Sequence, residues 1–376
     1  MRRILIVGLS DVMGGTETFL MNYYRNIDRD KIQFDFLTNK AHIAFEEEIK
    51  QMGGKVYRIL SPKKGFLKYK KSIKTFFQMH SRDYLAIWMN TSVLINLDYL
   101  KYAKKYGIQS RIIHSHTSKN FNGLLFGIVH NLNKRHIINK FATDFWACSM
   151  EAGKWFYTED IMKSKHFSVI SNAIDVDQYK YNEEVRQKYR RELGLGDAFV
   201  LGNVGRLHPL KNHSFMLDVF KQIQKKCDNS YLVCVGDGEL AEEIAEKAKN
   251  LGIENKVKML GSRQDVPDLL QVMDAFMLPS VFEGLPLSLL EAQAAGLVCY
   301  ASKGVISEEV KVTSELTFLP LDNNPGVWAD AILKTMDAID REKMYKEVKA
   351  SRFDIKNAAK DLEEKFHKME MRLNEN

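Results

Sequence analysis

The feature that most limits how this chain can fold is a regular alternation of short apolar runs with longer amphipathic stretches. Apolar runs of this length are typical of buried strands, and amphipathic stretches at helical spacing are typical of surface helices. In the first part of the chain the pattern predicts strands over residues 4–9, 33–37 and 86–89, and helices over residues 17–26, 45–52 and 97–106. Because strands that alternate with helices form parallel sheets covered on both faces, the pattern predicts an α/β fold.

The same alternation restarts after about residue 175. It predicts strands over residues 199–205, 231–235, 256–260 and 275–278, and helices over residues 213–226, 239–250 and 265–273. A length of 376 residues fits two domains that each bury their own core. We therefore predict two doubly wound domains facing a cleft, over residues 1–173 and 174–350, with a linker at residues 172–184. A C-terminal segment over residues 351–376, helical from residue 356, is expected to return towards the first domain.

Charge is distributed unevenly along this ordinary globular composition. A hydrophobic content of 45% with 27% charged residues excludes a disordered chain, a collagen and a coiled coil. Residues 1–170 hold 27 Lys and Arg against 14 Asp and Glu, a charge of +13, and the remainder holds 28 against 34, a charge of −6. A basic half favours an anionic partner, and charge alone leaves nucleic acid, a membrane surface and phosphorylated substrates open.

The cysteines and the apolar runs indicate in which cellular compartment the protein is expected to act. The four cysteines form no C-x-x-C pair, which argues against a zinc site and a secreted disulfide framework and favours a reducing cytosol. The first apolar run ends by Leu9 and Asp11 follows, so it predicts a buried strand rather than a signal peptide. Because the sequence holds no run of 18 apolar residues, membrane association is expected to be peripheral.

The first candidate site is the glycine-bearing turn over residues 8–17, between a predicted strand and a predicted helix. Gly14 and Gly15 leave room for a ligand, Thr16 is the expected N-cap, and amides at a helix start attract phosphate. The string has neither the G-x-G-x-x-G spacing of a nicotinamide fold nor the G-K-[ST] ending of a P-loop. A tight turn without a ligand remains the alternative.

The second candidate site follows a predicted strand at residues 202–212. Arg206 and Lys211 place two cations there, which could bind a diphosphate and stabilise the negative charge that develops as it leaves. Surface charges beside a helix are the alternative interpretation.

The third candidate site, residues 282–296, is the most informative. Pro286 suits the first position of a helix and Gly296 suits the position after its end, so Glu283 precedes the helix and Glu291 lies on its second turn. The carboxylates can accept hydrogen bonds from sugar or ribose hydroxyls, while the helix start favours an anion. The amides expected to contribute belong to Gly284, Leu285 and Leu287. An ordinary amphipathic helix with a solvated Glu291 remains the alternative.

Together these strings resemble the retaining family 4 glycosyltransferases, which have the two-domain GT-B fold. The resemblance rests on E-G-L-P-L-S-L-L-E-A-Q-A-A-G at residues 283–296 and on G-R-L-x-P-L-K-N at residues 205–212. Further strings follow the family's order at residues 14–17, 147–149, 169–175 and 235–240. The match covers most of residues 1–350 and is stronger in the second half. It implies a nucleotide-sugar donor held mainly by the C-terminal domain and an acceptor held mainly by the N-terminal domain.

The resemblance also implies a role for each matching residue. Glu291 would bind the ribose hydroxyls, Glu283 the transferred sugar, and the amides of Leu285 and Leu287 its hydroxyls or the diphosphate. Arg206 and Lys211 would hold the diphosphate, and Gly15 would approach it from the other domain. Gly205 and Gly284 complete the expected donor-binding set.

Two further matches and one departure concern the base and the sugar. Residues 261–263, with Arg263, would line the nucleobase pocket. His116 matches the family's histidine near the donor sugar, with His114 as the second choice, so the expected catalytic set adds His116 to Glu283 and the two cations. Ala173 stands where the family usually has Gly.

The resemblance implies front-face displacement with retention, in which the departing phosphate oxygen takes the acceptor proton. No pair of carboxylates suggests a double-displacement hydrolase. D-x-D strings occur at residues 28–30 and 175–177, but the first is expected in an exposed loop and the second in the linker, so we predict no metal and no cofactor.

A dense basic segment at residues 63–74 interleaves lysines with apolar residues. Such a segment suits an interfacial helix on anionic lipid, with a merely solvated helix as the alternative. No recognised nucleic-acid module accompanies it, so nucleic acid is not an expected partner. The lysines are Lys63, Lys64, Lys68, Lys70, Lys71 and Lys74, and the apolar residues are Phe66, Leu67, Tyr69, Ile73, Phe76 and Phe77.

The sequence therefore predicts a retaining glycosyltransferase that moves a hexosyl unit, from a UDP-sugar by expectation, to a lipid-linked or growing saccharide for exopolysaccharide or capsule assembly. It would act in the cytoplasm at the inner face of the cell membrane. Two alternatives are a non-catalytic nucleotide-sugar-binding accessory protein and a GT-B epimerase or phosphorylase. An epimerase would need a base beside the sugar ring and a phosphorylase a pyridoxal lysine, and neither can be seen.

Overall fold

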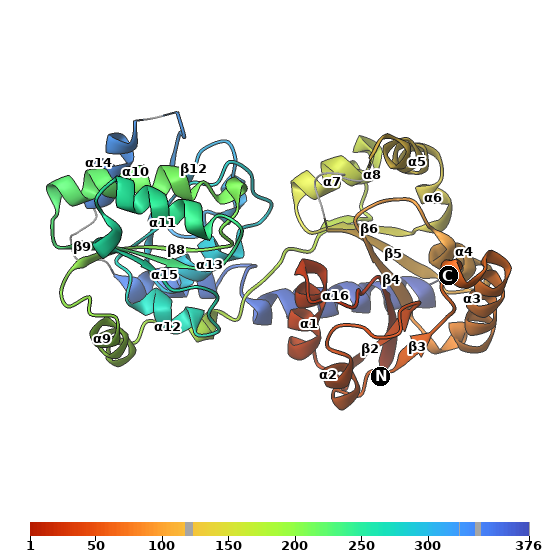
Figure 1. Cartoon of the computed structure of the whole chain (residues 1–376). Helices are drawn as coiled ribbons and strands as arrows, with labels where there is room; N and C mark the ends of the chain where they lie inside the picture. The colour runs from red at the N-terminus through yellow and green to blue at the C-terminus, as the bar shows by residue number, and fades with distance from the viewer. Residues whose placement is uncertain (117–122, 323, 335–339, 376) are drawn as a thin grey trace. The chain divides into compact units, whose positions relative to one another are not determined.

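The computed structural model describes residues 1–116, 123–322, 324–334 and 340–375, and the chain divides into two compact units (Figure 1). The first unit comprises Met1–Ala173 with Ile355–Asn376, and the second comprises Ile174–Asp354. The C-terminal helical segment is thus part of the first unit rather than an extension of the second.

The described residues of the first unit form a seven-stranded parallel sheet in the order β3-β2-β1-β4-β5-β6-β7. The strands are β1 (Arg2–Val7), β2 (Ile32–Thr38), β3 (Val56–Arg58), β4 (Ala86–Thr91), β5 (Ser110–Ser115), β6 (Asp144–Ala147) and β7 (Phe167–Val169). The helices are α1 (Gly15–Asn26), α2 (Glu46–Gln51), α3 (Phe66–His80), α4 (Asp98–Lys105), α5 (Gly123–His136), α6 (Ile138–Phe141), α7 (Met150–Phe156), α8 (Glu159–Lys163) and α16 (Ile355–Asn374). The strand order reverses direction between β1 and β4, the point at which open α/β sheets bind ligands.

The second unit repeats this plan with a six-stranded parallel sheet among its described residues, in the order β10-β9-β8-β11-β12-β13. The strands are β8 (Phe199–Val204), β9 (Ser230–Val235), β10 (Val257–Met259), β11 (Ala275–Leu278), β12 (Val298–Ser302) and β13 (Leu316–Leu319). The helices are α9 (Glu183–Glu192), α10 (His213–Lys226), α11 (Ala241–Asn250), α12 (Val266–Gln271), α13 (Leu287–Ala294), α14 (Pro325–Leu333) and α15 (Arg341–Lys349). The α/β class with two doubly wound sheets is confirmed.

Helix α16 completes the core of the first unit. Its buried residues recur at helical spacing, as expected for one apolar face against the sheet. Phe366 packs edge-on against Phe34 and Trp88, with ring centroids 6.2 Å and 6.0 Å apart, and α16 lies beside α1 (Figure 1). The chain therefore closes its first unit with its last helix.

Most of the predicted linker at residues 172–184, from Ile174 onward, is instead a packed part of the second unit. Val176 is fully buried and Tyr179 is 9% exposed, because the short 3-10 helix η3 (Val176–Tyr179) packs against α13 and α15. Asn182 caps α9 by accepting a hydrogen bond from the Val185 amide. The polar composition of this segment thus reflects capping and surface contacts, not a free connection.

Candidate functional site

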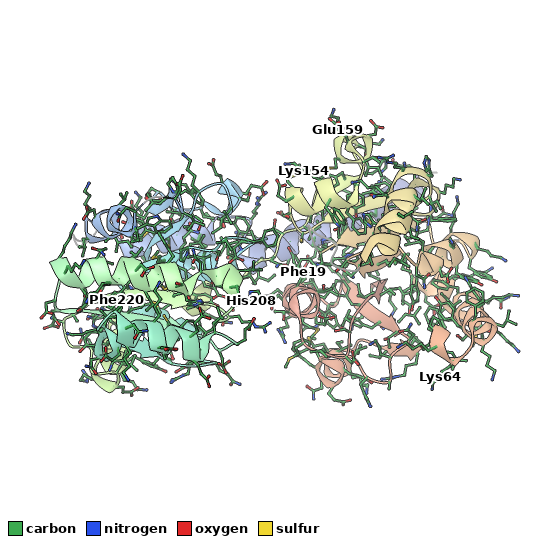
Figure 2. All side chains as sticks on the ribbon, turned by 45° about the horizontal axis from the view of Figure 1, so that its top comes forward. Phe19, Lys64, Lys154, Glu159, His208 and Phe220 are labelled. Atoms are coloured by element: carbon green, nitrogen blue, oxygen red, sulfur yellow. The ribbon has the colours of Figure 1, made fainter. Side chains whose placement is uncertain are left out.

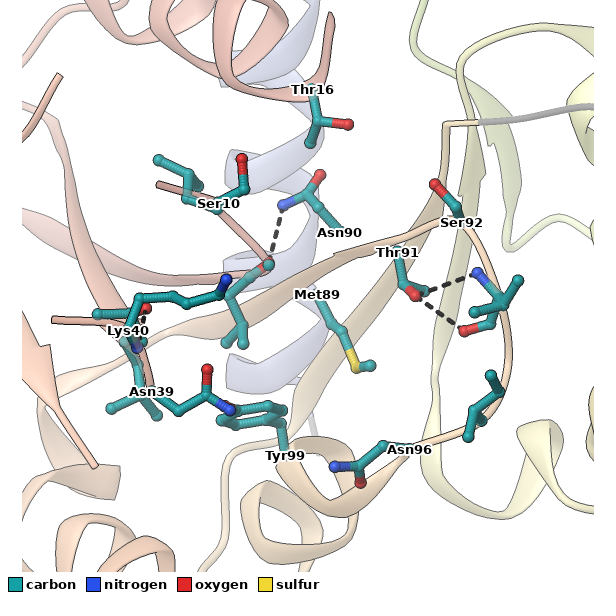
Figure 3. A pocket seen from close by; sticks show the side chains of 17 residues that line it. Ser10, Thr16, Asn39, Lys40, Met89, Asn90, Thr91, Ser92, Asn96 and Tyr99 are labelled. Atoms are coloured by element: carbon teal, nitrogen blue, oxygen red, sulfur yellow. Dashed lines mark hydrogen bonds between the residues drawn. The ribbon is translucent and has the colours of Figure 1, made fainter. Parts of the chain in front are cut away.

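In the first unit, a cavity of about 410 Å³ lies at the carboxyl ends of β1 and β4, where the strand order reverses (Figure 3). Its polar lining is mostly uncharged and carries hydroxyl and amide groups that both donate and accept hydrogen bonds. These groups include Asn39, Asn90, Thr91, Ser92, Asn96 and Tyr99. Lys40 is the charged residue of the lining, and the hydroxyl and amide groups suit a ligand rich in hydroxyls.

The glycine-bearing turn after β1 borders this cavity. Gly8 has φ +110°, and a Cβ there would lie 2.0 Å from the Asn90 carbonyl oxygen, so only glycine fits. The Glu17 carboxylate, which is buried, accepts a hydrogen bond of 2.8 Å from the Ser10 amide and braces the turn. The expectation that Thr16 is the N-cap was wrong, because α1 begins at Gly15 and Gly14 is its N-cap without a side-chain cap. Gly15 itself is exposed at the helix start.

His116 follows β5 and is held by Asn90. The Asn90 amide nitrogen donates to the Val7 and Trp88 carbonyls at 3.3 Å and 3.4 Å, which fixes its oxygen towards His116. That oxygen lies 2.8 Å from Nε2 of His116, so Nε2 must carry the proton. Desolvation lowers the pKa of His116 to about 3, so the ring is neutral at pH 7 and Nδ1 is an acceptor.

His114, the second choice from the sequence, is a core residue. It is fully buried, stacks on Trp88 with ring centroids 5.8 Å apart, and accepts a hydrogen bond from the Trp88 indole. Its pKa lies well below the usual value because burial disfavours the charged ring. His114 therefore packs against His116, and their ring centroids lie 4.2 Å apart.

In the second unit, the structure brings Lys211 and Glu283 together. The Lys211 ammonium lies 2.5 Å from Oε1 of Glu283, and the Ser280 hydroxyl donates to the same oxygen at 2.7 Å. Both carboxylate contacts from the described residues go to Oε1, so Oε2 is the oxygen left to accept from a ligand. Lys211 ends the 3-10 helix η4 (Pro209–Lys211), and Asn212 turns the chain into α10 from a left-handed conformation with φ 55°.

Arg206 lies nearby in the chain but is held by a different carboxylate. Its side chain is 70% exposed, and its guanidinium lies 3.1 Å from the Glu239 carboxylate. The other oxygen of that carboxylate lies 3.5 Å from Nε2 of His208. The backbones of the loops that carry these residues lie in close contact. A Cβ at Gly236 would lie only 2.0 Å from the Gly205 carbonyl oxygen, so a side chain there would clash. Gly205 is thus fixed by the loop after β9, and Glu239 is a site residue to which the sequence analysis gave no role.

Glu291 lies on the second turn of α13, within hydrogen-bond distance of Tyr179. Burial raises the pKa of Glu291, and a hydrogen bond from the Tyr179 hydroxyl opposes this by stabilising the carboxylate. Tyr179 was not among the residues predicted from the sequence, because residues 172–184 were predicted to form a linker. Leu290 and Ala292, the neighbours of Glu291 on α13, are fully buried, whereas the Glu291 side chain is partly buried.

The start of α13 differs by one residue from the prediction. Pro286 is the N-cap rather than the first helical residue, and no side-chain oxygen accepts a hydrogen bond from the first amides of the helix. Gly284 is exposed, and Leu285 and Leu287 are half-buried. Gly296 follows the helix end with φ +71°, as predicted for the residue after the C-cap.

Arg263 is fixed by Asp265. Its guanidinium makes two hydrogen bonds to that carboxylate, at 2.8 Å and 2.5 Å, and the Tyr189 hydroxyl donates to the same group. The Gly261 carbonyl accepts from the Gly236 amide at 2.8 Å, so residues 261–263 continue the loop surface that carries Gly205. The second unit thus groups Gly205, Arg206 and Arg263 on neighbouring loops, while Gly15 and His116 belong to the first unit.

The two D-x-D strings are occupied by structural contacts. Asp28 pairs with Lys31, and Asp177 pairs with Lys349 and accepts from Tyr345. Within the described ranges, no group of three or more His, Cys, Asp or Glu side chains is arranged to hold a metal ion. A search of the same residues finds no helix long and apolar enough to cross a membrane.

The basic segment at residues 63–74 is only partly exposed. Four of its six apolar residues pack into the core, because their spacing along α3 forms the buried face of that helix. These residues are Tyr69, Ile73, Phe76 and Phe77. Lys70 is paired with Asp98 at 2.6 Å. Phe66 and Leu67 are 63% and 82% exposed.

Comparisons with known proteins agree with this architecture. Residues 185–351 match the family model described as glycosyl transferases group 1. EpsF of Bacillus subtilis (strain 168), named as a glycosyltransferase, is 30% identical over 341 residues, covering 90% of this chain and 88% of that protein. An Escherichia coli protein named UDP-Gal:alpha-D-GlcNAc-diphosphoundecaprenol alpha-1,3-galactosyltransferase is 36% identical over 139 residues, 36% of each chain.

The similarity to solved structures concerns the fold. The crystal structure of Anabaena Alr3699/HepE in complex with UDP superposes with a TM-score of 0.76 at 22% identity, covering 98% of this chain and 100% of that chain. The full-length similarity to EpsF, the family match over the second unit and the two doubly wound sheets agree. The chain belongs to the group 1 glycosyl transferases and has the GT-B fold of that family.

Proposed function

We propose that this glycosyltransferase moves a hexosyl unit, with retention, from a UDP-sugar to a lipid-linked saccharide during exopolysaccharide or capsule assembly. The observation that carries the proposal is the combination, in the second unit, of the Glu291 carboxylate with the uncapped start of its own helix. A partly buried carboxylate suits a pair of ribose hydroxyls and an uncapped helix start suits a diphosphate. The UDP complex of HepE and the UDP-Gal in the E. coli relative's name support UDP as the nucleotide.

The roles of the remaining donor-site residues follow from their contacts. Oε2 of Glu283 would accept a hydrogen bond from a hydroxyl of the transferred sugar, since Lys211 and Ser280 hold Oε1. Lys211, Arg206 and the amides of residues 284, 285 and 287 would surround the diphosphate, and Arg263 would border the base. As the bond from the sugar to the diphosphate breaks, these donors would stabilise the charge on the leaving oxygen. That oxygen would take the proton of the attacking acceptor hydroxyl on the same face.

The acceptor and the sugar would meet the first unit. The amide and hydroxyl lining of its 410 Å³ cavity suits a saccharide. Nδ1 of His116 would accept a hydrogen bond from a sugar hydroxyl, because the neutral ring has its proton on Nε2. Gly15 would leave the start of α1 open to the diphosphate. The diphosphoundecaprenol in the E. coli relative's name supports an acceptor carried on a lipid.

A lipid-linked acceptor implies contact with the cytoplasmic face of the membrane. We define the membrane patch as Lys63, Lys64, Phe66 and Leu67, where the two lysines and the two apolar side chains are all exposed (Figure 2 labels Lys64). Two large apolar side chains beside two cations suit an anionic lipid surface, and each near-surface lysine contributes about 1 kcal/mol there.

Calorimetric titration with UDP, GDP and ADP tests the proposal. Wild type is expected to bind UDP selectively, and Glu291→Ala is expected to bind it more weakly. Release of UDP from a UDP-hexose, dependent on membrane extract as acceptor source, would then establish transfer. Nucleotide binding without release on any acceptor would favour a non-catalytic accessory protein, and failure to bind any nucleotide would refute the donor site.

A further inference from the structure

A second cavity in the first unit lies away from the sheet's point of reversal. It has a volume of about 500 Å³ and lies between the edge strand β3 and α3, two elements placed side by side in Figure 1. None of its lining residues belongs to the cavity at β1 and β4. Neither the family comparisons nor the proposed transfer reaction assigns it a ligand.

The periodicity of α3 decides which side chains enter this cavity. Lys68, Lys71 and Thr75 lie three and four positions apart along α3 and share one face, and Phe76 and His80 also line the cavity. The neighbouring face, which includes Ile73, is buried in the core. The opposite wall is the edge strand, which contributes Tyr57 and Arg58. Two lysines are therefore held at the rim by a helix that the core fixes in place.

The charge inside the cavity is not balanced by the acids around it. Arg58 is paired with Glu46 at 2.5 Å and His80 with Asp83 at 3.2 Å. Among the described residues, no ion pair joins Lys68 or Lys71 to a carboxylate, whereas Lys70 on the same helix has Asp98. The two lysines thus give the cavity an uncompensated positive charge.

The walls of the cavity add an apolar surface to this charge. The ring of Tyr57 lies 5.2 Å from that of Phe76 and 4.8 Å from that of His80, so three rings form one continuous wall. The exposed Phe66 and Leu67 precede Lys68 on the same helix. A ligand that carries an anionic group on an apolar body matches both features.

We propose that this cavity binds a phosphate group, with Lys68 and Lys71 on the phosphate oxygens and, when the phosphate is esterified to an apolar body, the rings of Tyr57 and Phe76 against that body. A membrane phospholipid is one source of such a group and free phosphate is the other. The site shares no residue with the donor site or the membrane patch. The phosphate-binding proposal can therefore be tested independently of the proposed transfer reaction.

Titration with soluble probes tests the site. The probes are inorganic phosphate and a short-chain phosphatidic acid below its micelle concentration, each added to wild type and to Lys68→Ser/Lys71→Ser. We expect the phosphatidic acid to bind wild type and to bind the double variant at least about tenfold more weakly, because charge-assisted hydrogen bonds are lost. Lys101→Ser/Lys105→Ser removes two exposed lysines from α4 of the same unit and is expected to bind like wild type.

The outcomes separate the sources and the alternatives. Equal binding of inorganic phosphate and phosphatidic acid would assign the site to free phosphate, and preference for phosphatidic acid would assign it to a lipid. Equal weakening by both double variants, or no binding of either probe to wild type, would overturn the site. Lys68→Ser/Lys71→Ser is expected to bind UDP as tightly as wild type. If this variant binds UDP normally but no longer binds phosphatidic acid, the phosphate site is distinct from the donor site.

Discussion

Replacement of Glu291 by Gln separates the proposed binding role of this residue from its cost to stability. The folded-state pKa of Glu291 is raised by burial. An acid with a raised pKa stabilises the fold below its unfolded pKa, and that contribution is lost as pH rises through the folded pKa. At pH 7 the ionised carboxylate therefore costs folding free energy, and the uncharged amide of Gln removes this cost. Glu291→Gln is expected to be at least as stable as wild type at pH 7.

Nucleotide binding is expected to change in the opposite direction. An ionised carboxylate that accepts from a ribose hydroxyl contributes about 1.5–3 kcal/mol, which corresponds to about a 10-fold to 150-fold change in Kd. UDP should bind Glu291→Gln more weakly by an amount within or somewhat below this range, since the Gln oxygen can still accept. Tyr179→Phe, which removes the hydroxyl that orients Glu291, should cost about 1 kcal/mol of binding, or about fivefold.

The assay is calorimetry with UDP and 2′-deoxy-UDP beside thermal unfolding of each variant. Removal of the 2′-hydroxyl should weaken binding to wild type strongly and to Glu291→Gln little, since the partner is already impaired. Glu243→Gln on α11 removes an exposed carboxylate from the same unit and serves as the control. If both proteins lose the same affinity with the deoxy ligand, Glu291 does not contact the ribose and the reasoning is refuted.

Four further predictions concern other parts of the chain. Lys211→Ala should lower the transfer rate on the order of 10²-fold, because it removes a donor to the leaving diphosphate, and near-normal turnover would contradict that role. Asn90→Leu should lower transfer more than UDP binding, because the tautomer of His116 is no longer fixed; unchanged kcat in steady-state assays would argue against it. Phe366→Ala should destabilise the fold by about 3–5 kcal/mol in denaturant titrations, because the ring is fully buried, and a loss under 1 kcal/mol would count against its core role. Ser at all four positions of the membrane patch should abolish sedimentation with anionic vesicles, whereas unchanged sedimentation would locate the contact elsewhere.

The elements that the sequence predicted best are those whose pattern is set by burial alone. The predicted strand over residues 275–278 and the predicted helix over residues 213–226 have the observed bounds of β11 and α10. A fully buried parallel strand is a continuous apolar run, and α10 is a long helix with one apolar face, so the local sequence pattern identifies both elements. The short strand at residues 257–259 was predicted too long, because its ends depend on pairing with β9.

The missed features depend on contacts between distant parts of the chain. Tyr179 was assigned to a linker because its segment is polar, yet the 3-10 helix that carries it packs against α13. Asn90 gave no signal, because its function arises from carbonyls at Val7 and Trp88 and from a ring 26 positions away. The burial of four apolar residues in the basic segment was also missed, because lysines and apolar residues adjacent in sequence lie on different faces of α3. Local pattern identifies which residues share a face but not what that face meets.

The pairing of the cations bears on how the proposed donor site would work. Lys211, Arg206 and Arg263 each lie against a carboxylate, from Glu283, Glu239 and Asp265 respectively. An ammonium has three donors and a guanidinium five, so each cation could contact a phosphate while it keeps its carboxylate. The carboxylates hold the cations in place, which lowers the entropy lost on binding, but they also cancel most of the attraction at long range. In the proposed donor site, positive potential would then come from the uncapped start of α13, where no carboxylate occupies the first turn.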